Sequence, residues 1–411
     1  MKHISLCLCF AFCLPFALLA QNGGKQKKAV FIIIDGVPAD VLERLDPPNL
    51  KRIAAEGGYT RAWLGGERNG YSETPTISAV GYNSLLTGTW VNKHNVFGNG
   101  IEDPNYNYWT IFRFLREARP EAKLAVYSTW LDNRTKLIGD GLPQTGNLRM
   151  DYHFDGLELD TVNYPHKDGK YIHFIDEAVS VEAAKGIREH APDLTWVYLQ
   201  YTDDIGHGMG DSKQMDEAVL MADRQIGRVY NAILDRQTYH NEDWQIYVTT
   251  DHGRDAATGR GHGGQSTREK TIWIATNAKD LNRYFYAGFP AVTDIMPGIA
   301  RHLNIEFPET RGREIDGISL AGPVSVANAD VFMKNGKLHI TWEAFDTEGD
   351  VGIYLAETNN FKTGGTDNYK PVGGAKLTDR KYIMDFKPLK GKVYKFLIEG
   401  EHNRVNRWLV E

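Results

Sequence analysis

AVFIIID, residues 29–35, is the stretch of this sequence that decides the fold. Its six apolar residues are mostly β-branched, which is typical of a strand buried on both faces of a parallel sheet. Asp35 follows the apolar run directly. The sequence therefore predicts a buried strand with a carboxylate at its carboxyl end.

Four further apolar runs resemble this strand, at residues 123–127, 194–200, 245–249 and 271–275. Apolar residues three and four positions apart predict helices, at residues 48–56, 169–190, 211–237 and 291–303. Strands that alternate with helices predict an α/β fold with a mostly parallel sheet. Residues from about 99 to 166 are aromatic and rich in loop signals, so we expect an insertion or cap there that determines substrate specificity.

The pattern changes after about residue 322. Short alternating strands are predicted at residues 330–333, 337–344, 351–356, 381–386 and 393–400, with turn signals such as Asn335-Gly336 between them. We expect residues 323–411 to form a β-sandwich that resembles a fibronectin type III module. The larger domain is then expected to span residues 29–322.

The beginning of the sequence has the pattern of a targeting segment. An apolar run over residues 4–19 ends at Ala20, and a polar stretch over residues 21–28 reads as a linker. This pattern predicts a signal peptide at residues 1–20 and export to the periplasm or the extracellular space. A buried helix or a membrane anchor is the alternative, but the run is short for a span and contains Pro15. All three cysteines lie within it, so no disulfide is expected after cleavage.

Composition excludes some partners. The net charge of −6 leaves no basic surplus for binding nucleic acid or an anionic membrane surface. We find no segment after residue 20 that is apolar enough to cross a bilayer. A chain of 411 residues is long enough to bury a large core and to carry a smaller second module.

Three acidic residues stand where predicted strands end, namely Asp35, Asp203 and Asp251. Because the carboxyl ends of parallel strands meet in one crevice, we expect these carboxylates to lie together. Such a cluster repels itself unless cations neutralise it. Three histidines are interleaved with the acids, namely His207, His252 and His262. Imidazole and carboxylate ligands together favour a borderline metal such as zinc.

Each of these residues also has an ordinary structural explanation. An aspartate after a strand usually caps a helix or ends a turn. Ser78, at the start of a predicted helix that ends near Gly88, has the position of an N-cap. The alternative is a metal-activated nucleophile, with free N–H groups at the helix start attracting a phosphoryl group. The residues alone leave both explanations open.

Over roughly residues 28–305 the chain resembles the alkaline phosphatase superfamily, in particular its type I phosphodiesterase/nucleotide pyrophosphatase branch. Ser78 stands ten positions before Gly88 of Leu85-Leu86-Thr87-Gly88, as the family's nucleophile does. The family's remaining motifs match the following residues: Asp203 and His207 for Asp-x-x-x-His, Asp251-His252-Gly253 for Asp-His-Gly, His262 for the late histidine, and His94 and Asn99 for the His and Asn after the nucleophile.

The resemblance implies a three-layer α/β/α fold and a two-zinc hydrolase that acts on a small phosphate ester, with other divalent metals as the alternative to zinc. It implies one zinc ion on Asp35, Ser78, Asp251 and His252, and a second on Asp203, His207 and His262. Ser78 would attack phosphorus and form a phosphoseryl intermediate, and Asn99 would bind a non-bridging oxygen. His94 is expected to be structural.

The chain departs from the family after the nucleophile, where phosphodiesterases usually read Thr-Phe-Pro-Asn-His and this chain reads Ser78-Ala79-Val80-Gly81-Tyr82. Ala79 replaces the aromatic residue that would stack on a base, so the pattern does not indicate a nucleotide. Val80 and Tyr82 replace the Pro and Arg that sulfatases need, which disfavours sulfate esters. Arg254 and Arg260 are expected to be solvated.

A phosphodiesterase is therefore the expected function. The alternatives are a phosphomonoesterase or phosphonate hydrolase that uses the same site, and an inactive surface binding protein.

Overall fold

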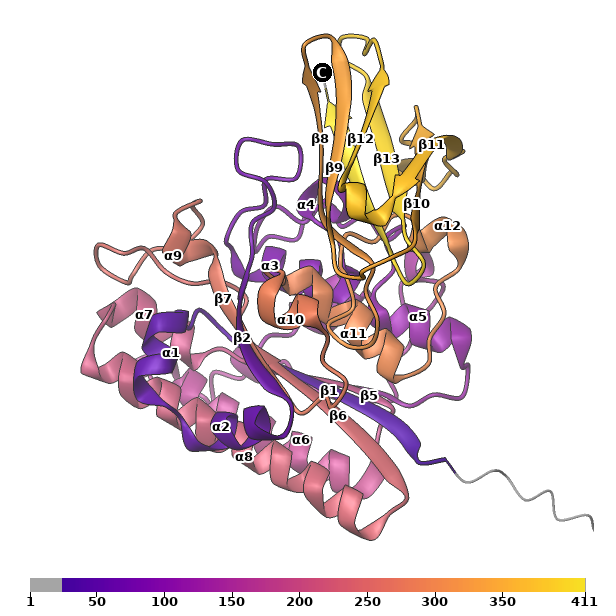
Figure 1. Ribbon diagram of the computed structural model, residues 1–411. Helices are drawn as coiled ribbons and strands as arrows, with labels where there is room; N and C mark the ends of the chain where they lie inside the picture. Colours follow the sequence, from indigo (N-terminus) through magenta and orange to yellow (C-terminus); the bar gives the residue numbers. More distant parts are fainter. Residues whose placement is uncertain (1–23, 411) are drawn as a thin grey trace, which may run out of the picture.

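The computed structural model describes residues 24–410, so the predicted signal peptide lies outside the described residues. Its larger part is built on a seven-stranded sheet in the order β2-β7-β6-β1-β5-β3-β4 (Figure 1). The strands are β1 (Gln26–Ile34), β2 (Gly58–Trp63), β3 (Leu124–Ser128), β4 (Tyr152–Phe154), β5 (Leu194–Leu199), β6 (Glu242–Thr249) and β7 (Thr271–Thr276). β1 begins inside the stretch that was expected to be a linker.

β1 is the central strand, and it pairs in parallel with β5 on one side and β6 on the other. Its residues from Ala29 to Ile34 are at most 1% exposed, which confirms the predicted buried strand. β3 pairs in parallel with β5 and with β4. β7 runs antiparallel to both β6 and β2. The sheet is therefore mixed but mostly parallel, as the sequence predicts.

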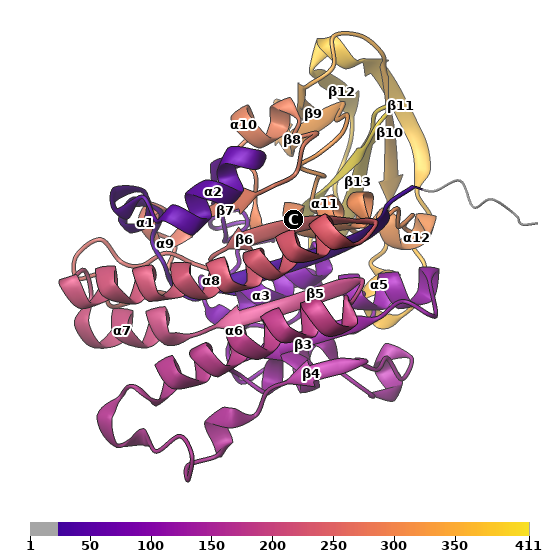
Figure 2. The same cartoon turned by 90° about the horizontal axis from the view of Figure 1, so that it is seen from below.

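Helices cover both faces of this sheet, which gives three layers (Figure 2). Val30, Ile32 and Ile34 of β1 pack in one core with α6 (Tyr171–His190) and α8 (Lys213–Tyr239). Phe31 and Ile33 pack in the other core with α3 (Ser78–Thr87), α5 (Ile111–Ala118) and α11 (Ile295–His302). Because side chains alternate along a strand, a run of apolar residues buries both faces.

Shorter helices complete the larger part, and most of them lie next to the loops around the sheet. They are α1 (Ala39–Leu45), α2 (Pro48–Glu56), α4 (Val91–His94), α7 (Tyr201–Met209), α9 (Thr267–Lys270), α10 (Arg283–Ala287) and α12 (Glu309–Gly312). No helix in the described part of the chain has both the length and the apolar character to span a bilayer.

The stretch from about 99 to 166 contributes more to the fold than an insertion would. It supplies α5, the interior strand β3 and the edge strand β4. Only the loop between β4 and α6 projects away from the sheet (Figure 2). The aromatic residues of the stretch, Phe112 among them, are partly core residues of the main fold, which is why composition alone suggested a separate cap.

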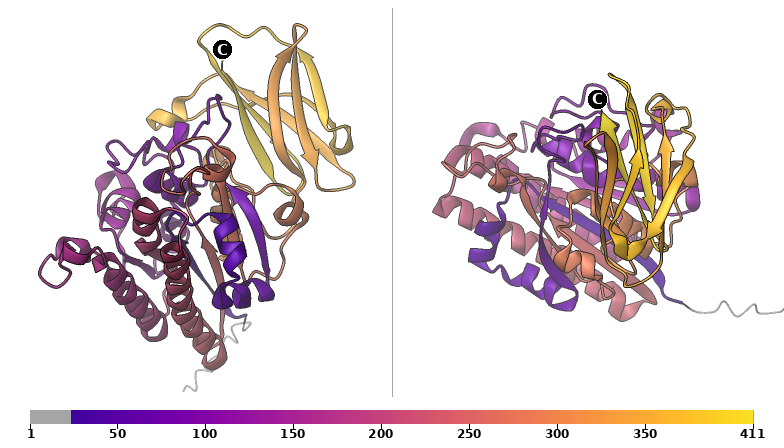
Figure 3. Two further views of the ribbon diagram at one scale, coloured as in Figure 1. Left: turned by 90° about the vertical axis from the view of Figure 1, so that its left-hand side faces the viewer. Right: turned by 45° about the horizontal axis from the view of Figure 1, so that its top comes forward.

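The C-terminal part consists of two antiparallel sheets, in the orders β11-β10-β13-β14 and β12-β9-β8 (Figure 3). The strands are β8 (Val326–Lys334), β9 (Lys337–Ala344), β10 (Asp350–Ala356), β11 (Lys370–Lys376), β12 (Lys381–Asp385), β13 (Val393–Glu399) and β14 (Arg404–Val410). Ile340, Ile353 and Phe396, from the two sheets, are fully buried in one core. The likeness to a fibronectin type III module stays a prediction.

Two buried lysines connect the C-terminal sheets to the main fold. The Lys93 Nζ atom donates to Asp316 Oδ1 at 2.6 Å and to Asn406 Oδ1 of β14 at 2.6 Å. Lys395 of β13 forms ion pairs with Glu314 and Asp367, the latter at 2.7 Å. Both lysine side chains are 0% exposed. Since a buried charge is costly unless it is paired, these contacts fix how the two parts meet.

An aromatic contact joins the same region to the loop over residues 64–77, between β2 and α3. The rings of Tyr71 and Trp408 are stacked, with centroids 5.3 Å apart. The backbone N–H of Trp408 donates to the Tyr71 hydroxyl at 3.2 Å, and Arg407 pairs with Glu67 at 2.7 Å. The loop that leads to α3 is therefore held by β14.

Candidate metal and catalytic site

The three aspartates that the sequence places at strand ends do lie together, at the carboxyl ends of β1, β5 and β6. Ligand atoms of Asp35, Asp203 and His252 all lie within 4.8 Å of one another. The His252 Nε2 atom is 3.4 Å from Asp35 Oδ1 and 3.2 Å from Asp251 Oδ2. Parallel strands with a shared edge produce this convergence: Asp35 directly follows β1, Asp251 stands two residues after β6, and Asp203 lies in the first turn of α7, which follows β5.

Ser78 joins this first group from α3. Its Oγ atom is 3.3 Å from His252 Nε2, and the residue is 5% exposed. The N-cap of α3 is Ile77, so Ser78 is the first helical residue. The capping explanation for Ser78 therefore does not apply, and its hydroxyl lies among the acids and the imidazole instead.

Asp203, His207 and His262 form a second group, whose ligand atoms also lie within 4.8 Å of one another. The His207 Nε2 atom is 3.3 Å from Asp203 Oδ2 and 3.0 Å from His262 Nε2. His207 reaches the group from the last turns of α7, and His262 from the loop before α9. The two groups touch, because the rings of His252 and His262 are stacked with centroids 3.8 Å apart.

Asp35 and Asp251 each use one carboxylate oxygen for protein contacts and leave the other oxygen open. Tyr198 donates to Asp35 Oδ2 at 2.6 Å, and Tyr82 donates to the same oxygen. The Gly36 N–H donates to Asp251 Oδ1 at 3.0 Å. Asp35 Oδ1 and Asp251 Oδ2 are buried without a hydrogen-bond partner among the described residues. These are the two carboxylate oxygens that lie 3.4 and 3.2 Å from His252 Nε2.

Two buried, unpartnered carboxylate oxygens fit a cation. Burial and the charges of Asp251 and Asp203 raise the pKa of Asp35 well above its usual range. Burial likewise raises the pKa of Asp251 to about 7. A divalent ion between these oxygens would supply the opposite charge that buried carboxylates otherwise lack. The residues present therefore fit a metal site of the carboxylate and imidazole type.

One histidine of each group, His252 in the first and His262 in the second, presents the nitrogen that a metal requires. The Nδ1 atom of His252 is 2.9 Å from the Gly253 carbonyl, and that of His262 is 2.8 Å from the Thr76 carbonyl. A carbonyl only accepts, so each Nδ1 carries the proton and each Nε2 keeps its lone pair. Burial lowers the pKa of His252 and of His262, which favours the neutral ring.

Arg254 differs from the prediction of a solvated arginine, since it is only 1% exposed. Its guanidinium forms an ion pair with Asp203 and donates to the Gly36, Asp203 and Arg260 carbonyls at 2.9, 2.9 and 3.0 Å. Burial of Asp203 opposes its ionisation, but the hydrogen bond with His207 and the charge of Arg254 lower its pKa. Sequence reasoning missed this residue because an arginine beside a glycine-rich loop normally faces solvent. Arg260 is exposed, as predicted.

Asn99 lies against the start of α3, as its predicted role requires. Its Oδ1 atom accepts from the Ala79 N–H at 3.0 Å, and the residue is exposed. The side-chain NH₂ group still offers its donors to a bound molecule. Asn99 also occupies the Ala79 N–H, so this backbone amide is not available to a substrate.

His94 has a structural position. It is 0% exposed, its Nδ1 atom accepts from the Val96 N–H at 3.1 Å, and its Nε2 atom is 3.1 Å from Ser84 Oγ. Burial lowers the pKa of His94 to about 3. The ring therefore ties the segment that carries Asn99 to α3.

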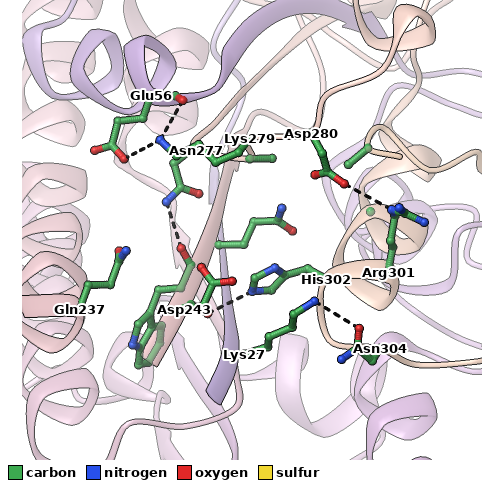
Figure 4. A pocket seen from close by; sticks show the side chains of 15 residues that line it. Lys27, Glu56, Gln237, Asp243, Asn277, Lys279, Asp280, Arg301, His302 and Asn304 are labelled. Carbon is green, nitrogen blue, oxygen red and sulfur yellow. Dashed lines mark hydrogen bonds and ion pairs between the residues drawn. The ribbon is translucent and has the colours of Figure 1, made fainter. Parts of the chain in front are cut away.

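A polar pocket of about 370 Å³ lies at the opposite ends of β1 and β6, where Lys27 and Asp243 are neighbours in the strand register (Figure 4). Its charged groups largely satisfy one another: Lys279 pairs with Glu56 at 3.2 Å, and Arg301 with Asp280 at 3.5 Å. The pocket contains none of the predicted site residues. The candidate site at the carboxyl ends of the strands is therefore separate from this pocket.

A model of the family described as type I phosphodiesterase / nucleotide pyrophosphatase matches residues 29–279. The chain belongs to this family. Mouse (Mus musculus) ectonucleotide pyrophosphatase/phosphodiesterase family member 7 is 23% identical over 266 residues, which are 62% of this chain and 56% of that protein. Venom phosphodiesterase 2 of Crotalus adamanteus is 23% identical over 241 residues, which are 57% of this chain and 27% of that protein. The chain thus spans little more than half of one relative and about a quarter of the other.

Solved structures agree with an alkaline-phosphatase-like fold. An inactive variant of murine ectonucleotide pyrophosphatase/phosphodiesterase 5 in complex with AMP has a TM-score of 0.50 and 13% identity, covering 69% of this chain and 96% of that chain. A putative sulfatase from Bacteroides thetaiotaomicron has a TM-score of 0.52 and 12% identity, covering 84% of this chain and 85% of that chain. At such identities the likeness concerns the fold alone.

Proposed function

We propose that this chain is an exported, two-zinc phosphodiesterase that acts through a phosphoseryl intermediate on Ser78. The observation that carries the proposal is the convergence of Ser78 Oγ, His252 Nε2 and the unpartnered oxygens of Asp35 and Asp251. Membership of the phosphodiesterase family supports it. The relatives named as venom and ecto enzymes support export.

The two groups of side chains divide the proposed ligands. Asp35, Ser78, Asp251 and His252 would hold one zinc ion, and Asp203, His207 and His262 would hold the other. When bound, zinc ions would lower the pKa of the serine hydroxyl and offset negative charge on the phosphate oxygens.

The chain's own residues then determine the course of the reaction. Ser78 Oγ attacks phosphorus, a phosphoserine ester forms, and the alcohol of the substrate leaves. Water then hydrolyses the bond between phosphorus and Ser78 Oγ, which restores the serine hydroxyl and releases a phosphate monoester. The Asn99 NH₂ group, held beside the start of α3, donates to a non-bridging oxygen through both steps.

The arrangement of Arg254 favours a phosphodiester over a phosphomonoester. A monoester dianion carries more charge than a diester and calls for an additional cationic donor. Each guanidinium nitrogen of Arg254 already donates to Gly36, Arg260 or Asp203. Arg254 therefore neutralises Asp203 and does not bind the substrate.

The alcohol part of the substrate is not proposed to be a nucleoside. Ala79, at the position of the family's stacking aromatic, is 0% exposed and belongs to the core. It offers no surface to a base.

Hydrolysis of bis-4-nitrophenyl phosphate and 4-nitrophenyl phosphate by the zinc-loaded chain tests the proposal. We expect kcat/KM for the diester to exceed that for the monoester by about tenfold or more, and two zinc ions per chain. Ser78→Ala should lower kcat by about three orders of magnitude or more.

Each contrary result identifies an alternative. Dominant monoester turnover would mean a phosphomonoesterase. Full activity of Ser78→Ala would rule out this nucleophile. A purified chain that binds no stoichiometric metal and hydrolyses neither ester would be an inactive binding protein.

A further inference from the structure

Thr76 lies between the proposed nucleophile and one of the proposed metal ligands. It stands two residues before Ser78, in the loop over residues 64–77, and it is 0% exposed. The hydrogen bonds of its hydroxyl and carbonyl groups are with His262, Gly263 and Gly264. One buried residue thus connects the segment that carries Ser78 to the segment that carries His262.

The carbonyl group of Thr76 sets the tautomer of His262. The His262 Nδ1–H group donates to this carbonyl at 2.8 Å. The Nε2 atom consequently keeps its lone pair, and it lies 3.0 Å from His207 Nε2 and 3.9 Å from Asp203 Oδ1. A hydrogen bond on the outer nitrogen of a metal-binding histidine fixes both its ring orientation and its tautomer.

The hydroxyl group of Thr76 holds the backbone that follows His262. It donates to the Gly264 carbonyl at 2.8 Å and accepts from the Gly263 N–H at 2.9 Å. Gly263 has a φ of +105°, a conformation that favours glycine, so the backbone here has little intrinsic rigidity. The two hydrogen bonds of the hydroxyl group supply the restraint that the glycines lack.

We propose that Thr76 is a positioning residue that locks His262 in place relative to Ser78, and thereby fixes the spacing of the two metal groups. The inference rests on the proposed function, because it assigns a role within the same site. Thr76 itself makes no contact with the substrate. It acts through His262.

Thr76→Val separates the hydroxyl from the rest of the residue, since valine keeps the shape and the carbonyl but loses both hydroxyl hydrogen bonds. Zinc titration of the full chain against a chromogenic chelator should show two sites in the wild type. In T76V, one site should lose about 10- to 100-fold in affinity while the other is unchanged. In T76V the backbone after His262 is released, so the ring can leave the Thr76 carbonyl. In the metal-free chain, ¹⁵N NMR should therefore show a single Nδ1–H tautomer for His262 in the wild type and a mixture in T76V.

Two variants serve as controls. Thr76→Ser keeps the hydroxyl, so it should restore both zinc affinities. Thr74→Val removes hydroxyl hydrogen bonds to the Ser72 carbonyl, at 2.9 Å, and from the Val91 N–H, at 3.3 Å, in the same loop. Thr74 is equally buried, so T74V should lower stability without changing zinc affinity.

Equal zinc affinities in T76V and the wild type would overturn the inference and leave the proposed function intact. A wild-type chain that binds no zinc would instead overturn the proposed function. If T76V does not fold, Thr76→Ala makes the same test. Two unchanged sites in T76A would overturn the inference equally.

Discussion

The carboxylates of this site each divide their two oxygens between the protein and the place where a metal would lie. In Asp35 and Asp251, neutral donors hold one oxygen. In Asp203 a charged donor, Arg254, holds Oδ1, and His207 lies beside Oδ2. Asp203 is therefore the one of these three acids whose charge the protein itself compensates.

Arg254→Met leads to the first prediction. Without the guanidinium, Asp203 is a buried charge without its partner, so we expect the free energy of unfolding to fall by about 3 kcal/mol in EDTA. Bound zinc replaces part of the missing charge, so the loss should be smaller with saturating zinc. Urea denaturation with and without zinc measures the difference.

Arg260→Met is the matched control, because Arg260 is exposed and its removal should change the stability little. An equal loss for R254M in EDTA and in zinc would show that Arg254 has no charge relation to the metal site.

His94 leads to a prediction about pH. Its pKa is lowered to about 3 by burial, so the folded chain keeps it neutral while the unfolded chain binds a proton below about pH 6.5. The unfolded state then holds more protons, and stability falls as the pH falls. Between pH 7 and pH 5 the wild type should lose about 2 kcal/mol more than His94→Gln, measured by urea denaturation in EDTA.

His153→Gln is the control for this measurement. His153 is exposed, so its replacement should change the stability little. A His94→Gln variant with the full wild-type slope would mean that another group carries the effect.

The residues of the two candidate groups could be proposed from sequence because each acid follows a strand and each histidine stands in a motif. Their convergence is then a consequence of sheet geometry. Arg254 and Thr76 could not be proposed in this way. Their contacts depend on the path of the glycine loop around His262, and neither periodicity nor composition encodes that path.

Among the elements, α3 matters most, because it brings Ser78 against the end of β6. This close approach requires Gly81. A Cβ atom there would lie 2.9 Å from the Asp251 carbonyl oxygen and 3.0 Å from the Asp251 Cβ atom. Both partners are held by neighbouring structure, so α3 itself would have to move.

Gly81→Ala tests this contact. Alanine stabilises a helix by about 1 kcal/mol relative to glycine, but here the steric contact opposes that gain. We expect a lower Tm and a loss of kcat of about tenfold or more, because Ser78 shifts relative to Asp251.

Gly208→Ala is the matched control in α7, since a Cβ atom at Gly208 meets nothing within 4 Å. This variant should raise the Tm slightly. A rise in Tm for both variants would show that α3 has room to adjust.

Sequence predicted the long buried strands of the main sheet, and it missed β2, β4, β11 and β14. β4 has three residues, and β2 carries polar residues such as Thr60 and the exposed Arg61. The antiparallel direction of β7 could not be predicted either, because an apolar run has no direction. β11 was missed for the same reason as β2, since most of its residues are exposed.

On the scale of the whole molecule, the C-terminal sheets support the loop that carries Thr76 and leads to Ser78. Trp408→Ala removes the stack on Tyr71 and should lower the free energy of unfolding by about 3–5 kcal/mol. At temperatures where the variant is folded, we expect kcat to fall more than KM rises, because the loop positions groups rather than binding substrate.

Trp408→Phe retains a stacking ring and should recover most of both losses. Wild-type kcat in a folded W408A would show that the loop keeps its position without β14.

The packing of the C-terminal sheets on the main fold was not predictable from sequence. Lysine is normally a surface residue, yet Lys93 and Lys395 are both fully buried at the junction. Their partners lie far away in sequence, and a buried ion pair leaves no local pattern.

The paired lysines also bear on the order in which the parts of this chain can fold during synthesis. Lys93, Glu314 and Asp316 emerge from the ribosome before Lys395 and Asn406 do. Until β13 and β14 have been made, Lys93 has Asp316 as its partner, but Glu314 lacks Lys395. A buried charge of this junction therefore gains its partner only when the last strands of the chain have been synthesised, so we expect the junction between the two parts to form last.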